Sequence, residues 1–202
     1  IGTFSAEHDH TTLISLTNLQ PNSRYEYKVN YGGGQPGKAS SFRTLPLPNT
    51  LSKFAFSSTS CSSKNLHYQH EMDAFTAMKQ QNAHLSFHLG DLIYADIPDS
   101  VNGLGENKAR YDAMYRYTFS DKHLQGLYQN TPIYTMYDDH EVFNDFHQSF
   151  ANSDAQFLAA LRSWEQYAGQ INVAPSQGQD RPRKGPPFYY NFTAGGAAFF
   201  VF

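Results

Sequence analysis

Three short apolar segments alternate with two amphipathic segments, and this alternation restricts the fold more than any other feature of the sequence. The apolar segments cover residues 54–56, 85–89 and 132–137, and the amphipathic segments between them cover 66–80 and 106–118. Parallel strands need a long crossover, usually a helix, to connect them. The pattern therefore predicts a layered α/β domain whose strands are joined by helices.

A further helix is predicted after Ser153 and Asp154, because both residue types are suited to cap a helix N-terminus. Apolar side chains then recur at helical spacing, at Phe157, Leu161, Trp164 and Ala168. With this helix included, we place the α/β domain at residues 53–202.

Residues 1–46 predict β structure of a different kind. Side chains that favour strands alternate along one face, at Tyr25, Tyr27, Val29 and Tyr31. The order Leu19, Pro21, Tyr25 resembles the corner of fibronectin type III and immunoglobulin-like sandwiches, whose tyrosine hydroxyl bonds back to the backbone. We expect residues 1–46 to be the last strands of such a sandwich, and residues 47–52 to be an extended linker.

The two ends of the chain suggest a piece of a longer protein. The chain begins at Ile1 without a charged or apolar leader, and it stops in the apolar run 198–202 with no turn after it. A domain that stopped inside a buried strand would leave its edge unpaired. We therefore expect a fragment cut at both ends, although a short terminal edge strand is an alternative.

Composition excludes several classes of protein. The hydrophobic fraction of 40% is enough for a packed core, so the chain is not a disordered tail. The net charge of −3 gives no electrostatic signature of nucleic-acid binding. No apolar run approaches the ~20 residues that a membrane helix needs. A single cysteine, Cys61, excludes an internal disulfide framework.

Polar residues follow each of the three predicted strands. The first strand ends near Ser60-Cys61, the second at Gly90-Asp91, and the third at Asp138-Asp139-His140-Glu141. The carboxyl ends of strands in open α/β sheets are where ligands bind, because loops and helix N-termini converge there. The sequence therefore predicts one ligand site built from three loops that are far apart in the chain.

Cation binding explains two of these loops better than ordinary turns do. Asp91 directly follows a buried strand, where a carboxylate is costly unless it is paired or bound to a cation. Tyr94 brings a phenol to the same loop, and Cys61 brings a thiol to the first loop. Taken alone, Asp91 fits a turn or a helix cap better than a metal site, and Cys61 fits plain core better.

The third loop is the sharpest local signal. The carboxylates of Asp138, Asp139 and Glu141 would repel one another around His140 unless cations relieved that repulsion. His140 is suited to bind metal or to donate a proton. Asn144 adds a neutral oxygen ligand to the same turn, and a solvated acidic loop is the alternative. Arg110 is a further candidate, for a phosphate group, although a surface ion pair would explain it equally well.

Together these motifs resemble those of the PhoD-like alkaline phosphatases, a branch of the calcineurin-type metallophosphoesterases. The shared features, in order, are Ser60-Cys61, Leu89-Gly90-Asp91-Leu92-Ile93-Tyr94, Tyr111 with Tyr115, Pro132, and Asp138-Asp139-His140-Glu141-Val142 with Asn144. That family also carries a small β-sandwich ahead of the catalytic domain, as residues 1–46 suggest here.

The resemblance implies a multinuclear site that holds Fe3+ and Ca2+. Cys61, Asp91 and Tyr94 would then bind iron. Asp91 would bridge to calcium, which Asp139 and Asn144 would help to bind. Oxygen-rich ligand sets suit calcium, while thiolate and phenolate suit iron.

The activity implied is hydrolysis of small phosphomonoesters and of some diesters by a metal-activated hydroxide, with His140 and Asp139 as catalytic residues. His140 would stabilise the transferring phosphoryl group or protonate the leaving alcohol. Nucleic acid is not expected to bind except as a substrate that is hydrolysed. The resemblance also implies export to the periplasm or the extracellular space. Further ligands in relatives lie beyond Phe202, so the isolated chain is expected to be inactive.

Two rival functions stay open from the sequence. One is a phosphodiesterase or phospholipase activity at the same metals. The other is a non-catalytic binding module in which the sandwich binds a partner and the α/β part is degenerate. Retention of Cys61, Asp91, Tyr94, Asp139 and His140 argues against degeneracy.

Overall fold

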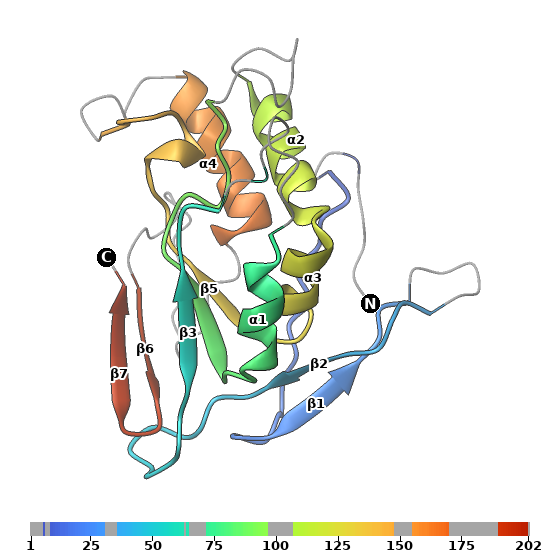
Figure 1. The fold of residues 1–202 in the computed structure, drawn as a ribbon, viewed down its shortest axis with the longest axis vertical. Coiled ribbons are helices and arrows are strands. Elements are labelled where there is room, and N and C mark those ends of the chain that lie inside the picture. The colour runs from blue at the N-terminus through green and yellow to red at the C-terminus, as the bar shows by residue number, and fades with distance from the viewer. Residues whose placement is uncertain are drawn as a thin grey trace.

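The computed structural model describes residues 6, 9–30, 36–62, 64, 72–96, 107–147, 155–169 and 190–201. Its centre is a parallel sheet of three strands in the order β3 (Phe56–Thr59), β4 (Leu85–His88) and β5 (Ile133–Thr135) (Figure 1). The three strands therefore end at one edge of the sheet, as the sequence predicts. We call this edge the carboxyl edge.

Helices cover one face of the sheet. α1 (Ala74–Gln80) and α3 (Lys122–Tyr128) pack together with Ile133 of β5. α2 (Lys108–Phe119) and α4 (Ala155–Tyr167) form a second cluster with the loop that follows β4. The Asn107 side chain caps α2 by accepting from the Arg110 N–H, and Asp121 caps α3 in the same way.

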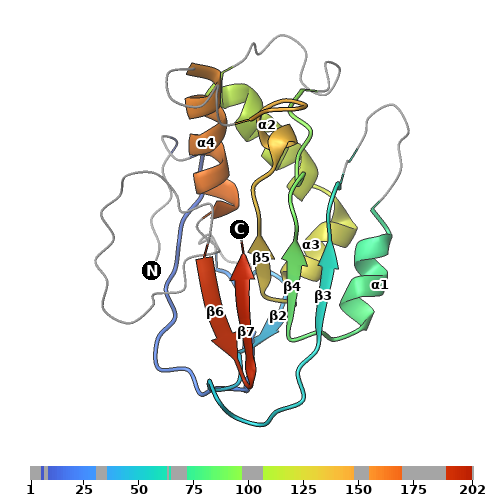
Figure 2. The same cartoon turned by 90° about the vertical axis from the view of Figure 1, so that its left-hand side faces the viewer.

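A hairpin covers the other face of the sheet (Figure 2). It consists of β6 (Tyr190–Ala194) and β7 (Ala197–Val201), which pair in antiparallel fashion. Its aromatic side chains meet those of the sheet, and the rings of Tyr134 and Phe192 stack with centroids 4.3 Å apart. The alternation along β4 explains the layers, because Phe87 faces the hairpin while His88 is buried on the opposite side.

The structure corrects the sequence prediction in several details. The predicted apolar segment runs to Leu89, but β4 ends at His88, and Leu89 is 42% exposed. α3 was not predicted, although Asp121 is a good cap and Leu124 and Leu127 lie three residues apart on its buried side. The predicted capping residues 153 and 154, and residues 66–71 of the first predicted helix, lie outside the described residues.

The predicted sandwich at residues 1–46 is not shown. The described part of this region contains one antiparallel hairpin, β1 (Arg24–Tyr27) with β2 (Ser40–Arg43), and an isolated bridge between Asn30 and Pro36. The corner contact expected of Tyr25 is present, since its hydroxyl accepts from the Gln20 N–H at 2.7 Å. The boundaries 1–46, 47–52 and 53–202 stay predictions.

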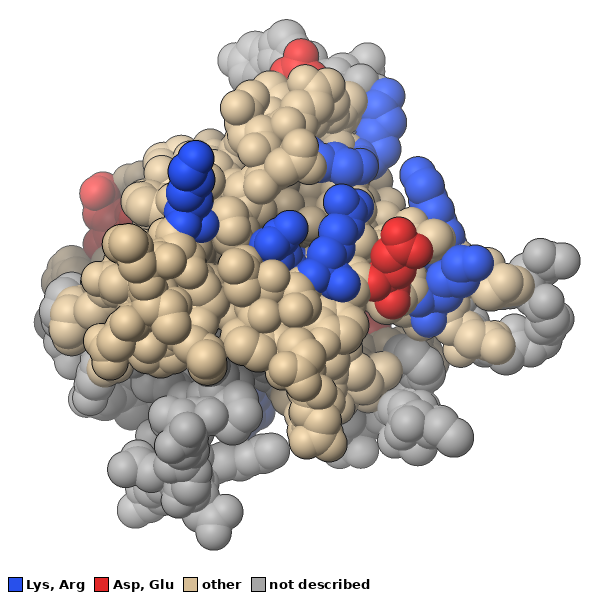
Figure 3. All heavy atoms as spheres, turned by 90° about the horizontal axis from the view of Figure 1, so that it is seen from below, with Lys and Arg blue, Asp and Glu red and all other residues tan. Residues whose placement is uncertain are grey.

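Charge is unevenly distributed over the surface. Figure 3 views the molecule from below, at the end opposite the carboxyl edge, and the charged side chains visible on its described surface are mostly Lys and Arg. The acidic cluster at the carboxyl edge is therefore not part of a uniformly acidic surface. Within the described residues, no helix combines the length and the apolar character needed to cross a membrane.

Candidate metal centre

Backbone hydrogen bonds tie the three loops of the carboxyl edge together. The Cys61 N–H donates to the Gly90 carbonyl at 3.2 Å, and the Ser62 N–H donates to the Asp91 carbonyl at 3.0 Å. On the other side, the Ala95 N–H donates to the carbonyl of His140 at 3.2 Å. The loop after β4 is thus the central loop, with one neighbour on each side.

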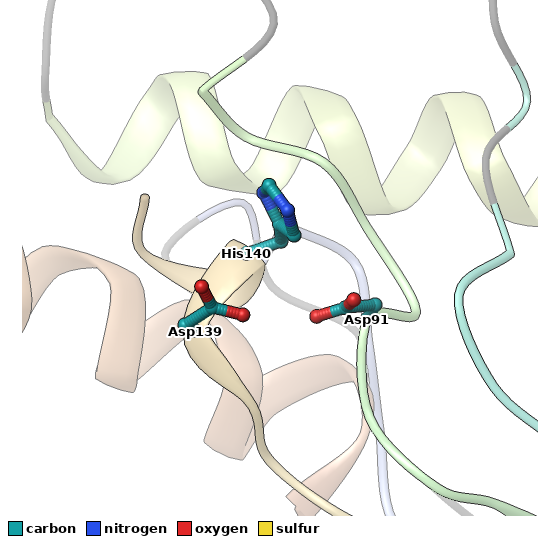
Figure 4. A group of neighbouring side chains, drawn as sticks. All are labelled: Asp91, Asp139 and His140. Atoms are coloured by element: carbon teal, nitrogen blue, oxygen red, sulfur yellow. The ribbon is translucent and has the colours of Figure 1, made fainter. Parts of the chain in front are cut away.

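Asp91, Asp139 and His140 converge at this edge (Figure 4). One ligand atom from each lies within 4.8 Å of those of the other two. Asp91 is only 6% exposed, and its Oδ1 has no hydrogen-bond partner among the residues that the structure describes. A buried carboxylate oxygen without a partner, beside a second carboxylate and an imidazole, is the donor set that a cation would satisfy.

An unusual backbone turn presents Asp91 to this group. Gly90 has φ +94° and Asp91 has φ +54°, both in the region that side chains with a Cβ rarely adopt. A Cβ added at Gly90 would lie 2.5 Å from the Cβ of Asp138, so only glycine permits this close approach of the two loops.

Glu141 connects the same two loops from the buried side. It belongs to the short 3-10 helix η2 (Asp139–Glu141) and is 1% exposed. Its carboxylate accepts from the backbone N–H groups of Leu92 at 2.6 Å, Asp138 at 2.8 Å and Asp91 at 3.2 Å. Burial raises the pKa of Glu141, while the three N–H donors act to lower it and favour the carboxylate form. From the sequence, Glu141 had no predicted role beyond its place in the acidic run.

Tyr94 and Cys61 lie beside Asp91. The Tyr94 hydroxyl donates to Asp91 Oδ2 at 3.3 Å. Burial raises the pKa of Tyr94, and charge and hydrogen bonding from Asp91 and Cys61 raise it further. The Cys61 thiol is exposed rather than part of the core. The phenol of Tyr94 thus lies next to both the Asp91 carboxylate and the Cys61 thiol, while Cys61 is not part of the group of Asp91, Asp139 and His140.

His140 is fixed in place by Asp96, which the sequence analysis did not single out. His140 Nδ1 lies 2.9 Å from Asp96 Oδ1, while Asp96 Oδ2 accepts from the Asn144 N–H at 3.0 Å. Partial burial lowers the pKa of His140, but the hydrogen bond and charge of Asp96 outweigh it and raise the pKa overall. The centroid of the His140 ring also lies 4.2 Å from the centroid of the Tyr94 ring. A carboxyl group two positions after Tyr94, at the same strand end, was the only signal for Asp96.

The other candidate residues are Asp138, Asn144 and Arg110, and their surroundings differ. Asp138 caps η2 and accepts from the Asp139 N–H at 3.0 Å. The Asn144 amide is exposed and donates to the Asp145 carboxylate at 2.6 Å. Arg110 lies in the first turn of α2, with its Nε buried and without a hydrogen-bond partner among the described residues. The metal role of Asn144 and the phosphate role of Arg110 stay predictions.

Comparison with known proteins identifies the family. The sequence profile of the PhoD-like phosphatases matches residues 54–201. This chain belongs to the PhoD-like phosphatase family. Alkaline phosphatase D of Bacillus subtilis (strain 168) is 27% identical to it over 210 residues, which cover 95% of this chain and 34% of that protein. The chain thus spans about a third of the length of this curated relative.

Solved structures show the same fold. A structure of PhoD superposes with a TM-score of 0.77 at 23% identity, covering 96% of this chain and 40% of the PhoD chain. The purple acid phosphatase PPD1 of yellow lupin superposes with a TM-score of 0.58 at 18% identity, covering 92% of this chain and 31% of that one. Membership of the PhoD-like family is therefore confirmed, and so is a mixed α/β fold like that of PhoD.

Proposed function

We propose that this PhoD-like protein hydrolyses phosphoesters with the help of metal ions bound at the carboxyl edge. The single observation that carries the proposal is the buried Asp91 carboxylate, whose Oδ1 lacks a partner among the described residues beside Asp139 and His140. A purely structural turn would be expected to pair that oxygen. Family membership supports the reaction type.

The donor atoms fit two kinds of ion. Cys61, Asp91 and Tyr94 would bind Fe3+, because thiolate and phenolate ligands suit iron. Asp91, Asp139 and Asn144 would bind Ca2+ through oxygen atoms. When bound, these ions would activate water as a nucleophile and offset the charge of the phosphoryl group.

The side chains of this chain have distinct tasks in the proposed reaction. Asp91 and Asp139 supply negative charge to hold the cations beside the substrate. Asp96 accepts a hydrogen bond from His140 Nδ1 and so orients the imidazole, which leaves Nε2 for the substrate. As the bond from phosphorus to the leaving oxygen breaks, the proton of Nε2 passes to that oxygen, and the alcohol leaves neutral.

Small phosphomonoesters are the proposed substrates, with some diesters as secondary ones. No described contact favours a phosphodiesterase or phospholipase over this activity. Export to the periplasm or the extracellular space stays a prediction from the family resemblance, and cell fractionation would test it.

The test uses the full-length protein, purified and loaded with iron and calcium. We expect p-nitrophenyl phosphate to be hydrolysed faster than bis(p-nitrophenyl) phosphate. Removal of the metals by a chelator should abolish hydrolysis, and elemental analysis should find iron in the active protein. Full activity in chelated, metal-free protein would exclude the proposal, whereas faster hydrolysis of the diester would favour the phosphodiesterase.

A further inference from the structure

Glu141 holds together the two loops that carry the candidate ligands, although it is not itself part of the ligand cluster. We propose that Glu141 is a positioning residue that builds the metal centre before a metal binds, by fixing the loop of Asp91 against the loop of Asp139 and His140. This inference rests on the proposed function, because it assigns a task within the same metal centre.

The hydrogen bonds of Glu141 divide between the loops. Oε1 accepts from the Leu92 N–H at 2.6 Å, and Oε2 accepts from the N–H groups of Asp91 at 3.2 Å and Asp138 at 2.8 Å. Asp91 and Leu92 follow β4, while Asp138 precedes η2 after β5. One buried carboxylate thus joins two segments that lie about 50 residues apart in sequence.

The turn at Gly90 and Asp91 explains why a carboxylate is needed at this point. With positive φ at both residues, the successive N–H groups of Asp91 and Leu92 converge on one side of the loop. Convergent N–H groups form a concave anion site, called a nest. Glu141 occupies that nest, and the Asp91 side chain points toward Asp139 and His140 (Figure 4).

Glu141 is therefore distinct from the ligands themselves. Both of its oxygens already accept from N–H groups, and it is 1% exposed. Asp91 shows the opposite state, with Oδ1 left without a partner among the described residues. In the acidic run after β5, Glu141 thus accepts from backbone N–H groups with both oxygens, whereas Asp139 belongs to the group of candidate ligands with Asp91 and His140.

Glutamine cannot replace Glu141 in this role, although it has nearly the same shape. Its amide has one oxygen and one NH2 group, and NH2 does not accept. In one orientation the NH2 faces the Leu92 N–H, and in the other it faces the N–H groups of Asp91 and Asp138. Either orientation loosens one loop while the volume of the side chain is kept.

The test compares Ca2+ affinity in full-length protein stripped of metal. Equilibrium dialysis with Ca2+ alone should give a dissociation constant about 10- to 100-fold higher for Glu141→Gln than for the wild type, the range found when outer-shell partners of metal ligands are changed. Hydrolysis by Glu141→Gln should recover toward the wild-type rate as Ca2+ is raised, because the ligands themselves are intact.

Asp112→Asn is the matched control. Asp112 is also a buried carboxylate, 8% exposed, but it accepts from Lys108 within α2 at 2.7 Å and joins α2 to α4 by accepting from Ser163 at 2.6 Å. This variant should lower the midpoint of thermal unfolding while leaving Ca2+ affinity unchanged. The comparison therefore separates positioning of the metal ligands from general loss of stability.

The outcomes distinguish this inference from the proposed function. Wild-type Ca2+ affinity in Glu141→Gln would overturn the positioning role and leave the proposed function intact. A wild-type protein that neither binds Ca2+ nor hydrolyses phosphoesters would overturn both. If Glu141→Gln does not fold, amide hydrogen exchange of metal-free wild type decides. Protection of Leu92 and Asp138 equal to that of β4 supports the inference, and exchange as fast as in exposed loops overturns it.

Discussion

The carboxyl edge of the β3–β5 sheet and the β1–β2 hairpin are both short β structures joined to turns, but they differ in how a key polar side chain is hydrogen-bonded. In the hairpin, the Tyr25 hydroxyl accepts from the Gln20 N–H, and its ring stacks on Phe42 with centroids 5.8 Å apart. At the carboxyl edge, Asp91 has positive φ and an oxygen without a partner among the described residues. Positive φ does not separate the two regions, because Asn18 and Asn22 before the hairpin also have it. The difference is the buried carboxylate oxygen without a partner, and such a group calls for a functional explanation.

Asp91→Asn, at the carboxyl edge, should have the largest effect, and the effect should be on activity. Loss of the carboxylate removes the ligand shared by the proposed iron and calcium sites. Metal ions contribute several kcal/mol to transition-state stabilisation, so kcat/KM should fall about 1000-fold. The unfolding free energy of metal-free protein should stay the same or rise, because a buried carboxylate with one oxygen lacking a partner among the described residues is replaced by a neutral amide.

Steady-state kinetics and urea denaturation of the same preparations measure both effects of this substitution. A variant that lost stability in the metal-free state while keeping its activity would show that Asp91 serves the fold rather than a metal.

Gly90→Ala should produce the next largest effect, on stability. The added Cβ would meet the Cβ of Asp138 at 2.5 Å, and φ of +94° is strained for alanine. Strained backbone and overpacking each cost about 1–3 kcal/mol, so we expect a loss of about 3–4 kcal/mol in the free energy of unfolding. Gly196→Ala is the control, because nothing lies within 4 Å of a Cβ added there. Equal urea midpoints for the two variants would contradict the close approach of the loops.

The candidate ligands could be predicted from the sequence because each directly follows an apolar strand. Asp91 and Asp139 needed only the rule that the ends of parallel strands share one edge. Glu141 and Asp96 escaped prediction for the opposite reason. Their partners are backbone N–H groups and an imidazole about 50 and 44 residues away, and a sequence does not show where such groups point.

The secondary structure, too, could be predicted from the sequence only in part. β4 and β5 follow from apolar runs, whereas α3 was missed because its seven residues are few for a periodic pattern and include Gly126. The predicted sandwich is not shown, since the described residues before the linker form a hairpin. Alternating side chains identify strands, but they do not show how many strands pair.

His88 allows a test of the core directly beneath the carboxyl edge. It is 1% exposed, and its Nε2 lies 2.6 Å from the Ser62 hydroxyl. Burial lowers the pKa of His88 to about 4, below its ordinary value of 6.5. The unfolded chain therefore takes up a proton more readily than the folded chain as the pH falls below 6.5.

The contribution of His88 to the free energy of unfolding should therefore decrease as the pH falls from 6.5 to 4, and it should stay constant below pH 4. At pH 4.5 the loss due to His88 should be about 2–3 kcal/mol relative to pH 7.5. Urea denaturation of metal-free wild type and His88→Gln at pH 7.5 and pH 4.5 isolates this contribution, since glutamine does not titrate. The same pH dependence in both proteins would show that His88 is not the group responsible.

Tyr25→Phe should give the smallest effect and sharpen the comparison from the hairpin side. The substitution keeps the ring that stacks on Phe42 and removes the oxygen that accepts from the Gln20 N–H. A partly exposed hydrogen bond of this kind contributes about 0.5–1 kcal/mol, so the urea midpoint should fall slightly. Phosphatase activity and Ca2+ affinity should be unchanged, because the Tyr25 hydroxyl bonds within its own segment, to the Gln20 N–H. A loss of Ca2+ affinity in Tyr25→Phe would instead mean that the hairpin supports the metal centre, and the contrast between the two regions would not hold.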